Sequence, residues 1–232
     1  MPVARGSMAH MPRTVLISEG DSPLGAALAR LLVSRGCSVV TTVPRPTGGG
    51  SLPGASSSGR TPLAVAWNRR SPVSARTVLL DAINAFEVVD DVLILEPPCP
   101  VIAPLPETAS ADIERAFDDA RGPVFLAREA LAYFKRRGSG VLCMVSLGPA
   151  AAPLERGMRE CFRGVCTSLL SAAGTAGVVV NGFQSGGVGI EEFADFVDRV
   201  LEEKARTISG RWFTCAPRGG FLQGVLPRKA ST

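Results

Sequence analysis

The sequence has neither the long apolar runs nor the blocks of charge that mark specialised surfaces. No apolar stretch reaches the roughly 18 residues that a membrane-spanning helix needs. The 25 basic and 21 acidic residues are spread along the chain, and the net charge is only +4. These absences argue against a membrane protein and against a nucleic-acid-binding protein. With 46% apolar residues among 232, the chain is typical of a globular protein with one domain.

Side chains that commonly carry chemistry are also few. The chain has one tyrosine, Tyr133, and one histidine, His10, and its three lysines are Lys135, Lys204 and Lys229. The six cysteines occur singly, at spacings that match no zinc site, so we expect no metal and interpret them as reduced core residues of a cytoplasmic protein. They are Cys37, Cys99, Cys143, Cys161, Cys166 and Cys215.

Two segments have the composition of irregular chain. The opening MPVARGSMAHMPR has two arginines, no acid and no apolar signal core, so we expect residues 1–12 to be a leader or tag remnant. The stretch PRPTGGGSLPGASSSGRTP is dense in Gly, Pro and Ser and predicts a flexible loop at 44–62. Residues 13–232 are then expected to form a single domain.

Short apolar runs alternate with helical patterns along that domain. The runs predict strands at 14–18, 37–43, 63–67, 90–95, 140–148, 177–183 and 209–217. Apolar residues at helical spacing predict helices at 22–36, 71–86, 111–138, 154–174 and 190–205. Strands that alternate with crossover helices predict an α/β fold, a Rossmann-like doubly wound parallel sheet flanked by helices.

The order of these elements resembles the short-chain dehydrogenase/reductase superfamily from Arg13 to about Phe221. VLISEGDSPLGAALARLL is similar to the family's opening strand, glycine turn and helix, and RGPVFLAREALAYFKRRGSGVLCMVS to its central helix and the strand with the catalytic serine. GVVVNGFQSG and SGRWFTCAPRGG are similar to its last two strands. The resemblance implies an NAD- or NADP-dependent oxidoreductase scaffold.

The cofactor turn departs from the family pattern Thr-Gly-x-x-x-Gly-x-Gly. The matching stretch is SEGDSPLG, in which Ser18 takes the threonine position and only Gly25 keeps its glycine. Glu19 replaces the first glycine and Pro23 the second. A carboxylate beside two phosphates costs on the order of 1 to 4 kcal/mol, and proline removes an N–H donor. We therefore expect no dinucleotide in this chain.

Other cofactor contacts implied by the resemblance are weakened too. Val43 stands where an acidic residue meets the adenosine ribose, and Asn68 where an aspartate meets the adenine. Arg45 is interpreted as a solvated loop residue. The strand end Asn-Asn-Ala-Gly becomes LEPP, residues 95–98, whose prolines remove further donors.

The catalytic residues that the resemblance implies are an asparagine, a serine, a tyrosine and a lysine four residues after it. Their positions fall on Asp119, Ser146, Glu155 and Arg159, so only the serine is kept. Tyr133 cannot restore the pair, because the residue four beyond it is an arginine. We therefore interpret these four positions as vestigial.

Simpler interpretations exist for the same side chains. Glu155 and Arg159 have the i,i+4 spacing of a surface ion pair, and Ser146 has no evident base to activate it. Asp118 and Asp119 read as a solvated helix face. The segment SGGVG joins the sixth strand directly to the last helix, so we also expect the family's helical substrate lid to be missing.

The parts that remain match those through which family members associate, namely the two long central helices and the end of the chain. Apolar residues fall on more than one side of these helices, as in a helix that faces both its sheet and a partner, although a well-buried core helix explains the pattern as well. They are Val124, Phe125, Ala127, Leu131, Phe134, Met158, Phe162, Val165, Leu169 and Leu170. The tail FLQGVLP is a further apolar contact segment in this interpretation.

Three functions are consistent with these residues. The first is a non-catalytic subunit in a heterodimer or heterotetramer with an active short-chain dehydrogenase paralogue, which would hold the NAD or NADP. It is similar to the inactive subunit of two-subunit hydroxyacyl-CoA dehydrogenases such as that of benzylsuccinate breakdown. The second is a free-standing small-ligand sensor or protein adaptor. The third is a residual enzyme that uses Ser146 and Glu155.

Overall fold

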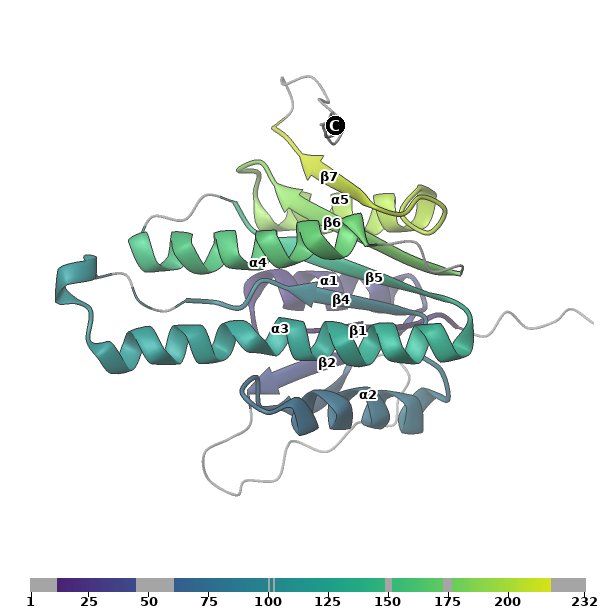
Figure 1. Cartoon of the computed structure of the whole chain (residues 1–232). Helices are drawn as coiled ribbons and strands as arrows, with labels where there is room; N and C mark the ends of the chain where they lie inside the picture. Colours follow the sequence, from purple (N-terminus) through teal and green to yellow (C-terminus); the bar gives the residue numbers. More distant parts are fainter. Residues whose placement is uncertain are drawn as a thin grey trace, which may run out of the picture.

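The computed structural model describes residues 12–44, 61–99, 101, 103–148, 152–172 and 177–217 (Figure 1). Residues 1–11 of the expected leader, residues 45–60 of the expected loop with Arg45, and the tail at 221–227 lie outside this range.

Seven parallel strands form one sheet in the order β3-β2-β1-β4-β5-β6-β7. Two crossovers in opposite directions from β1 give the doubly wound topology that the sequence predicts. The strands are β1 (Thr14–Ile17), β2 (Ser38–Pro44), β3 (Leu63–Trp67), β4 (Asp91–Leu95), β5 (Gly140–Ser146), β6 (Val178–Ser185) and β7 (Arg211–Cys215).

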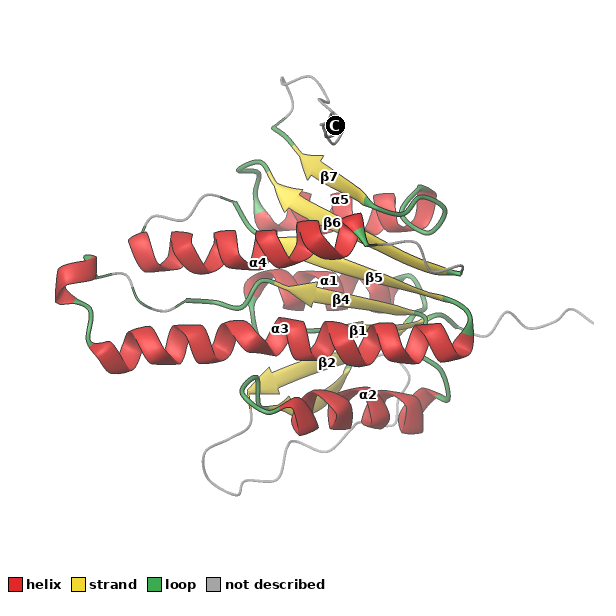
Figure 2. Ribbon diagram, in the orientation of Figure 1, coloured by secondary structure: helices red, strands yellow, loops and turns green. Residues whose placement is uncertain are grey.

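Helices cover both faces of the sheet (Figures 1 and 2). The elements are α1 (Pro23–Ser34), α2 (Pro72–Phe86), the 3-10 turn η1 (Leu105–Glu107), α3 (Ser110–Arg137), α4 (Pro153–Ser171) and α5 (Ile190–Glu203). Helices α2, α3 and α4 lie on one face, and α1 and α5 pack together on the other. Because β4 and β5 are buried from both sides, their sequences are almost continuously apolar.

Local chemistry sets where several helices begin and end. The hydroxyl of Ser71 accepts a hydrogen bond from the N–H of Ser74 at 3.2 Å, and Pro72 occupies the first turn, as the sequence predicts. Ser22 caps α1 in the same way. Helix α3 ends at Gly138, whose φ of 79° lies in the left-handed region that glycine adopts without strain.

The apolar residues of α3 and α4 mostly face the sheet. Phe134 and Phe162 are buried, whereas Val124 is 43% exposed. The core-helix interpretation therefore explains most of this pattern, and only a part of it remains for a partner.

A buried charge cluster lies at the amino ends of the strands. Asp91, at the start of β4, is fully buried and contacts Arg13 Nε at 2.8 Å and Arg206 Nη1 at 3.2 Å. Burial raises the pKa of Asp91 to about 6, although both arginines act in the opposite direction.

Three expectations from the sequence concern a helical lid, a metal site and a membrane-spanning helix. Strand β6 ends at Ser185 and α5 begins at Ile190, so only residues 186–189 connect them and no helical lid is inserted there. Across the described ranges, no group of His, Cys, Asp and Glu side chains is arranged to hold a metal ion. None of the helices in the described part of the chain is long and apolar enough to cross a membrane.

The expectation that all six cysteines are core residues is wrong in part. Cys143, Cys166 and Cys215 are buried, but Cys37 and Cys99 are only partly covered. Cys161 is exposed, because it lies on the side of α4 that faces away from the sheet.

Candidate functional site

The positions that the sequence predicts to be vestigial gather at the carboxyl ends of the central strands, where ligands bind in open α/β sheets. A cavity of about 210 Å³ lies there, between the first turns of α1 and α5, the segment after β4, and α4. The sequence-predicted residues Pro23, Glu155 and Arg159 line it together with Glu96, which the sequence analysis did not single out.

The turn between β1 and α1 keeps a glycine-like backbone although glycine has been replaced. Glu19 has a φ of 55°, in the left-handed region. Gly25 is required where the helix crosses this turn, because a Cβ there would lie 2.1 Å from the carbonyl oxygen of Glu19. The main chain at Glu19 and the contact at Gly25 therefore both have the geometry that glycine favours.

The N–H groups of this turn are used internally. The N–H of Gly20 donates to the carbonyl oxygen of Thr42 at 2.8 Å, and that of Ser22 to the carbonyl oxygen of Glu19 at 2.9 Å. The N–H of Gly25 donates to Ser22 Oγ at 3.0 Å, and Pro23 has no N–H to offer. Few donors are left for an anion at this helix N-terminus.

Glu19 itself is held by an arginine that the sequence analysis overlooked. Its side chain is buried, and Arg69 binds it with two donors, Nε to Oε1 at 2.7 Å and Nη2 to Oε2. Helix α3 passes close above Arg69, since a Cβ at Gly122 would come within 2.7 Å of Arg69 Cβ. Burial raises the pKa of Glu19, and Arg69 opposes that rise. The carboxylate is thus a neutralised internal group and not a free charge.

Asp119 contacts the arginines next to Glu19 and does not lie with Ser146. Its Oδ1 accepts from Arg70 Nε at 3.3 Å, and its Oδ2 lies 4.0 Å from Arg69 Nη1. The interpretation of Asp119 as part of a solvated helix face is therefore wrong, whereas Asp118 pairs with Arg121 on the surface as expected.

The other three catalytic positions form a second cluster around Glu96, directly after β4. Ser146 Oγ donates to Glu96 Oε2 at 2.8 Å, and the N–H of Leu147 donates to the same oxygen at 3.2 Å. Arg159 Nε donates to Glu96 Oε1 at 2.5 Å. Burial raises the pKa of Glu96, and Arg159 and Ser146 lower it again in part.

Arg159 also reaches the residue one helical turn before it. Its Nη2 donates to Glu155 Oε1 at 3.1 Å, as the i,i+4 spacing predicts. The pair is not a surface pair, however, because Arg159 is only 8% exposed. The expectation of a surface ion pair is wrong, because Arg159 also binds the buried Glu96.

The arrangement has limited means for proton or hydride chemistry. Ser146 is fully buried, and its hydroxyl donates to Glu96. The oxygen of Tyr133 accepts from the N–H of Val89 at 3.2 Å, just before β4 begins and so at the opposite end of the sheet from the cavity. Lys135 and Lys204 lie at the ends of α3 and α5.

Glu96, Arg69 and Arg70 leave only a weak signal in the sequence. Glu96 is a charged residue immediately after the buried run DVLIL, and the two arginines follow the apolar run LAVAW and Asn68. A charge at the carboxyl end of a parallel strand points to the ligand-binding end of the sheet, but its partner is 49 to 63 residues away and cannot be identified by spacing.

Comparison of the structure with solved proteins identifies the fold. A levodione reductase is 14% identical with a TM-score of 0.72, over 88% of this chain and 96% of the other. A 3-ketoacyl-(acyl-carrier-protein) reductase from Brucella melitensis, solved with NADH, is 15% identical with a TM-score of 0.72, over 87% and 96%. A 3-ketoacyl-ACP reductase from Sinorhizobium meliloti 1021 is 17% identical with a TM-score of 0.71, over 88% and 97%.

No protein-family model and no curated protein matches the sequence. The chain therefore shares the fold of these reductases at a sequence identity of 14 to 17%.

Proposed function

We propose that this protein is a non-catalytic subunit of a hetero-oligomeric short-chain dehydrogenase and supports an active paralogous subunit. The observation that carries the proposal is the pair of buried ion pairs, Glu19–Arg69 and Glu96–Arg159, at the two places where this fold handles cofactor and proton. Each carboxylate is paired with an arginine of the same chain. The fold is kept, while charged side chains at the carboxyl ends of its strands bind one another.

The cofactor side of the proposal rests on the turn after β1. A dinucleotide needs free N–H donors and a close approach of the backbone to its phosphates. Here the donors of Gly20, Ser22 and Gly25 are occupied, and Glu19 with Arg69 fills the adjoining space. We infer that the chain binds no NAD or NADP, and that the cofactor of the complex resides in the partner.

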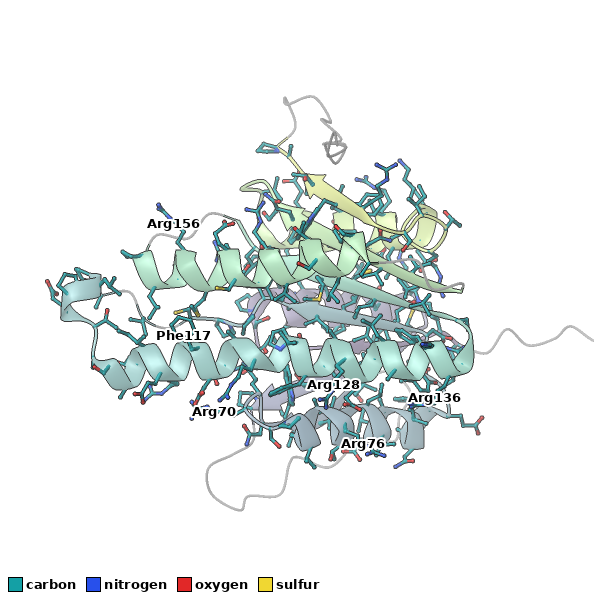
Figure 3. The ribbon with its side chains drawn as sticks, in the orientation of Figure 1. Arg70, Arg76, Phe117, Arg128, Arg136 and Arg156 are labelled. Atoms are coloured by element: carbon teal, nitrogen blue, oxygen red, sulfur yellow. The ribbon has the colours of Figure 1, made fainter. Side chains whose placement is uncertain are left out.

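The partner surface is assigned to the outward sides of α3 and α4. Phe117 and Val124 are seven residues apart on α3, hence on one face, and are 53% and 43% exposed. On α4 the exposed positions include Gly157 and Gly164, where an added Cβ meets no other atom, so a partner helix has room to approach. Figure 3 shows Phe117 and Arg156 on this same face of the molecule.

The neighbours in structure support a proposal for the substrate class. Two of them are named for reduction of 3-ketoacyl groups on acyl carrier protein. We therefore propose that the complex acts on a hydroxyacyl or ketoacyl thioester, such as an acyl-CoA.

Co-expression with an intact short-chain dehydrogenase encoded in the same genome tests the proposal. We expect the two chains to co-purify, and the dehydrogenase activity to fall when this chain is omitted. Val124→Glu places a charge in the assigned surface and is expected to break the complex, whereas Leu80→Glu, 46% exposed on α2, leaves it intact. Independent purification of both chains with full activity would contradict the proposal.

Titration of the purified chain with NAD and NADP by calorimetry is the companion measurement. We expect no binding of either dinucleotide at concentrations at which active reductases are saturated. Tight binding to the isolated chain would overturn the cofactor assignment even if the complex forms.

The alternative of a free-standing ligand sensor is favoured by one observation, the cavity beside Arg159. A monomer that resists co-purification but binds a small molecule would select that alternative.

A further inference from the structure

A broad cavity lies at the amino ends of the strands, at the opposite end of the sheet from the two buried ion pairs. Its volume is about 990 Å³, and four arginines line it: Arg13, Arg35, Arg137 and Arg206. The subunit role proposed above makes no use of this cavity. The concentration of arginine side chains is its main chemical feature.

The fold brings these arginines together from four separate parts of the chain. Arg13 directly precedes β1, and Arg137 is the last residue of α3. Arg35 caps the end of α1, and Arg206 follows the end of α5 at Glu203. Crossover helices run back along a parallel sheet, so their carboxyl ends gather at the amino ends of the strands (Figure 1). The helix dipole favours a cation at each helix end, but it does not by itself require the arginines to line one cavity.

Two of the carboxylates that balance these arginines are buried beneath them. Asp91 is fully buried and is shared by Arg13 and Arg206. Asp198 is also buried, and Arg35 Nη2 lies 3.2 Å from its Oδ2, whereas the Arg35 side chain itself is 64% exposed. A solute that enters the cavity therefore meets these guanidinium groups before it meets the carboxylates.

Two other carboxylates, Asp90 and Glu202, line the cavity. Asp90 accepts from Arg137 Nη2 at 2.8 Å and, through its other oxygen, from the N–H of Thr14 at 2.9 Å, so its oxygens are already used. Glu202 is 53% exposed and contacts Arg13. Four arginines and two carboxylates give the lining an excess of positive charge.

The exposed guanidinium groups keep donors for a ligand. Each guanidinium has five N–H donors. Among the described residues, Arg35 forms an ion pair through Nη2 and Arg206 through Nη1, and their other nitrogens form no further ion pair there. The planar guanidinium group binds phosphate oxygens with two parallel hydrogen bonds. Several such groups around a broad cavity match an anion with several phosphate groups.

We propose that this cavity binds an anion that carries several phosphate groups in a chain. The spare N–H groups of Arg35 and Arg206 donate to its oxygens, and Arg13 and Arg137 add positive potential. This inference goes beyond the subunit role, because binding requires this chain alone and uses the opposite end of the sheet.

Tripolyphosphate and inorganic phosphate test the proposal. Each is titrated into the purified full-length chain by calorimetry at pH 7.5, at constant ionic strength and without divalent metal ions. We expect tripolyphosphate to bind at least about tenfold more tightly, because its further phosphate groups form additional charge-assisted hydrogen bonds. Equal affinities, or no binding of tripolyphosphate at millimolar concentration, would overturn the proposal.

ATP distinguishes two sources of the same chemistry, because it carries a triphosphate chain on a nucleoside. If ATP binds more tightly than tripolyphosphate, the ligand is a nucleotide. If ATP binds equally or more weakly, the phosphate chain alone is recognised.

A matched pair of variants on one helix locates the site. Arg35→Gln removes an arginine of the cavity, and we expect about a fivefold or greater loss of tripolyphosphate affinity. Arg30→Gln is the control, because Arg30 is also on α1 and its side chain is 66% exposed against 64% for Arg35, but it does not line the cavity. We expect this control to lose less than about twofold, since salt screens distant charges. Equal losses would indicate general attraction to a positive protein and would overturn the assignment.

A substitution with the opposite sign separates binding from a structural role. Glu202→Gln removes the exposed carboxylate of the cavity and releases Arg13 from it. We expect tripolyphosphate to bind about two- to fivefold more tightly to this variant. Circular dichroism checks that each variant is folded. Unchanged or weaker binding by folded Glu202→Gln would contradict the placement of the anion in this cavity.

The result is independent of the subunit proposal. Tripolyphosphate binding by a chain that finds no partner would leave this inference standing and remove the subunit role. A stable complex with no tripolyphosphate binding would do the reverse.

Discussion

The two buried ion pairs at the carboxyl ends of the strands differ in what surrounds them. Around Glu19 the carboxylate is held by two donors of Arg69, and the neighbouring N–H groups are used internally. Around Glu96 the carboxylate is equally well paired, but Arg159 keeps one unpaired nitrogen beside a cavity. The first region is closed, whereas the second region is still a pocket with altered chemistry. Two buried ion pairs at the same end of one sheet therefore need not leave the same kind of surface.

The largest expected effect is at the pocket. Arg159→Met leaves Glu96 buried without its counter-charge, which is expected to lower the free energy of unfolding by about 3 to 5 kcal/mol. Urea denaturation followed by circular dichroism measures this. The double variant Glu96→Gln/Arg159→Met removes both charges and is expected to recover part of the loss. If the single variant loses under about 1 kcal/mol, the pair does not stabilise the pocket as described.

A smaller loss is expected at the closed turn. Arg69→Met deprives Glu19 of its partner, but the Arg69 side chain is 16% exposed against 9% for Arg159, so we expect about 2 to 3 kcal/mol. Arg70→Met is the control, because Arg70 is 46% exposed and is expected to cost less than about 1 kcal/mol. Equal losses in the two variants would show that the difference between buried and exposed arginines does not hold here.

Acid is expected to stabilise the fold over part of the pH range. Asp91, Glu19 and Glu96 all have folded pKa values above their ordinary values, so the folded chain holds protons that the unfolded chain releases. The stability that these groups contribute is complete below the unfolded pKa and is lost as pH rises through the folded pKa. For Asp91 this window runs from pH 3.8, its ordinary pKa, to the folded pKa of about 6.

Asp91 alone is expected to raise the free energy of unfolding by about 1 kcal/mol between pH 7 and pH 5, and the two glutamates add to it. Urea midpoints at several pH values measure the slope, and Glu96→Gln should reduce it. A midpoint that falls steadily from pH 7 to pH 5 would contradict the assignment of raised pKa values.

The smallest effect is expected at the serine. Ser146→Ala removes one of three donors to Glu96, which costs about 0.5 to 1.5 kcal/mol of stability. We expect no change in the activity of the complex with its active partner, measured at saturating substrate. Loss of turnover in a variant that still folds and still binds its partner would revive the interpretation of Ser146 as a reactive group.

The fold follows from the sequence because its signals are local. Buried parallel strands need continuous apolar runs, and crossover helices need apolar residues at helical spacing. The run DVLIL therefore predicts a strand, and the stretch after Ser71 predicts a helix, without reference to the rest of the chain. The sequence also predicts that Ser146, Glu155 and Arg159 lie near one another. Ser146 ends β5, and the other two lie in the first turns of the next helix, α4.

The partners of the charged residues do not follow from the sequence. Glu96 meets Arg159 across 63 positions, and Glu19 meets Arg69 across 50, with no pattern that links them. A spacing argument sees only Glu155 and Arg159 on one helix and predicts a solvated pair. Burial decides the matter, and burial depends on how the segment after β4 packs against α4, which is a property of the whole fold.

The left-handed torsion of Glu19 affects which substitutions this turn can accept. Glycine adopts a φ of 55° freely, so a replacement at this position needs no new path for the main chain. Exchange of the side chains at positions 19, 23 and 69 would not by itself free the amide groups of the turn, because Gly20 and Ser22 donate their N–H groups to main-chain oxygens. The main chain of this turn thus accepts a side chain at position 19 as it stands, whereas opening its amide groups would require the main chain itself to move.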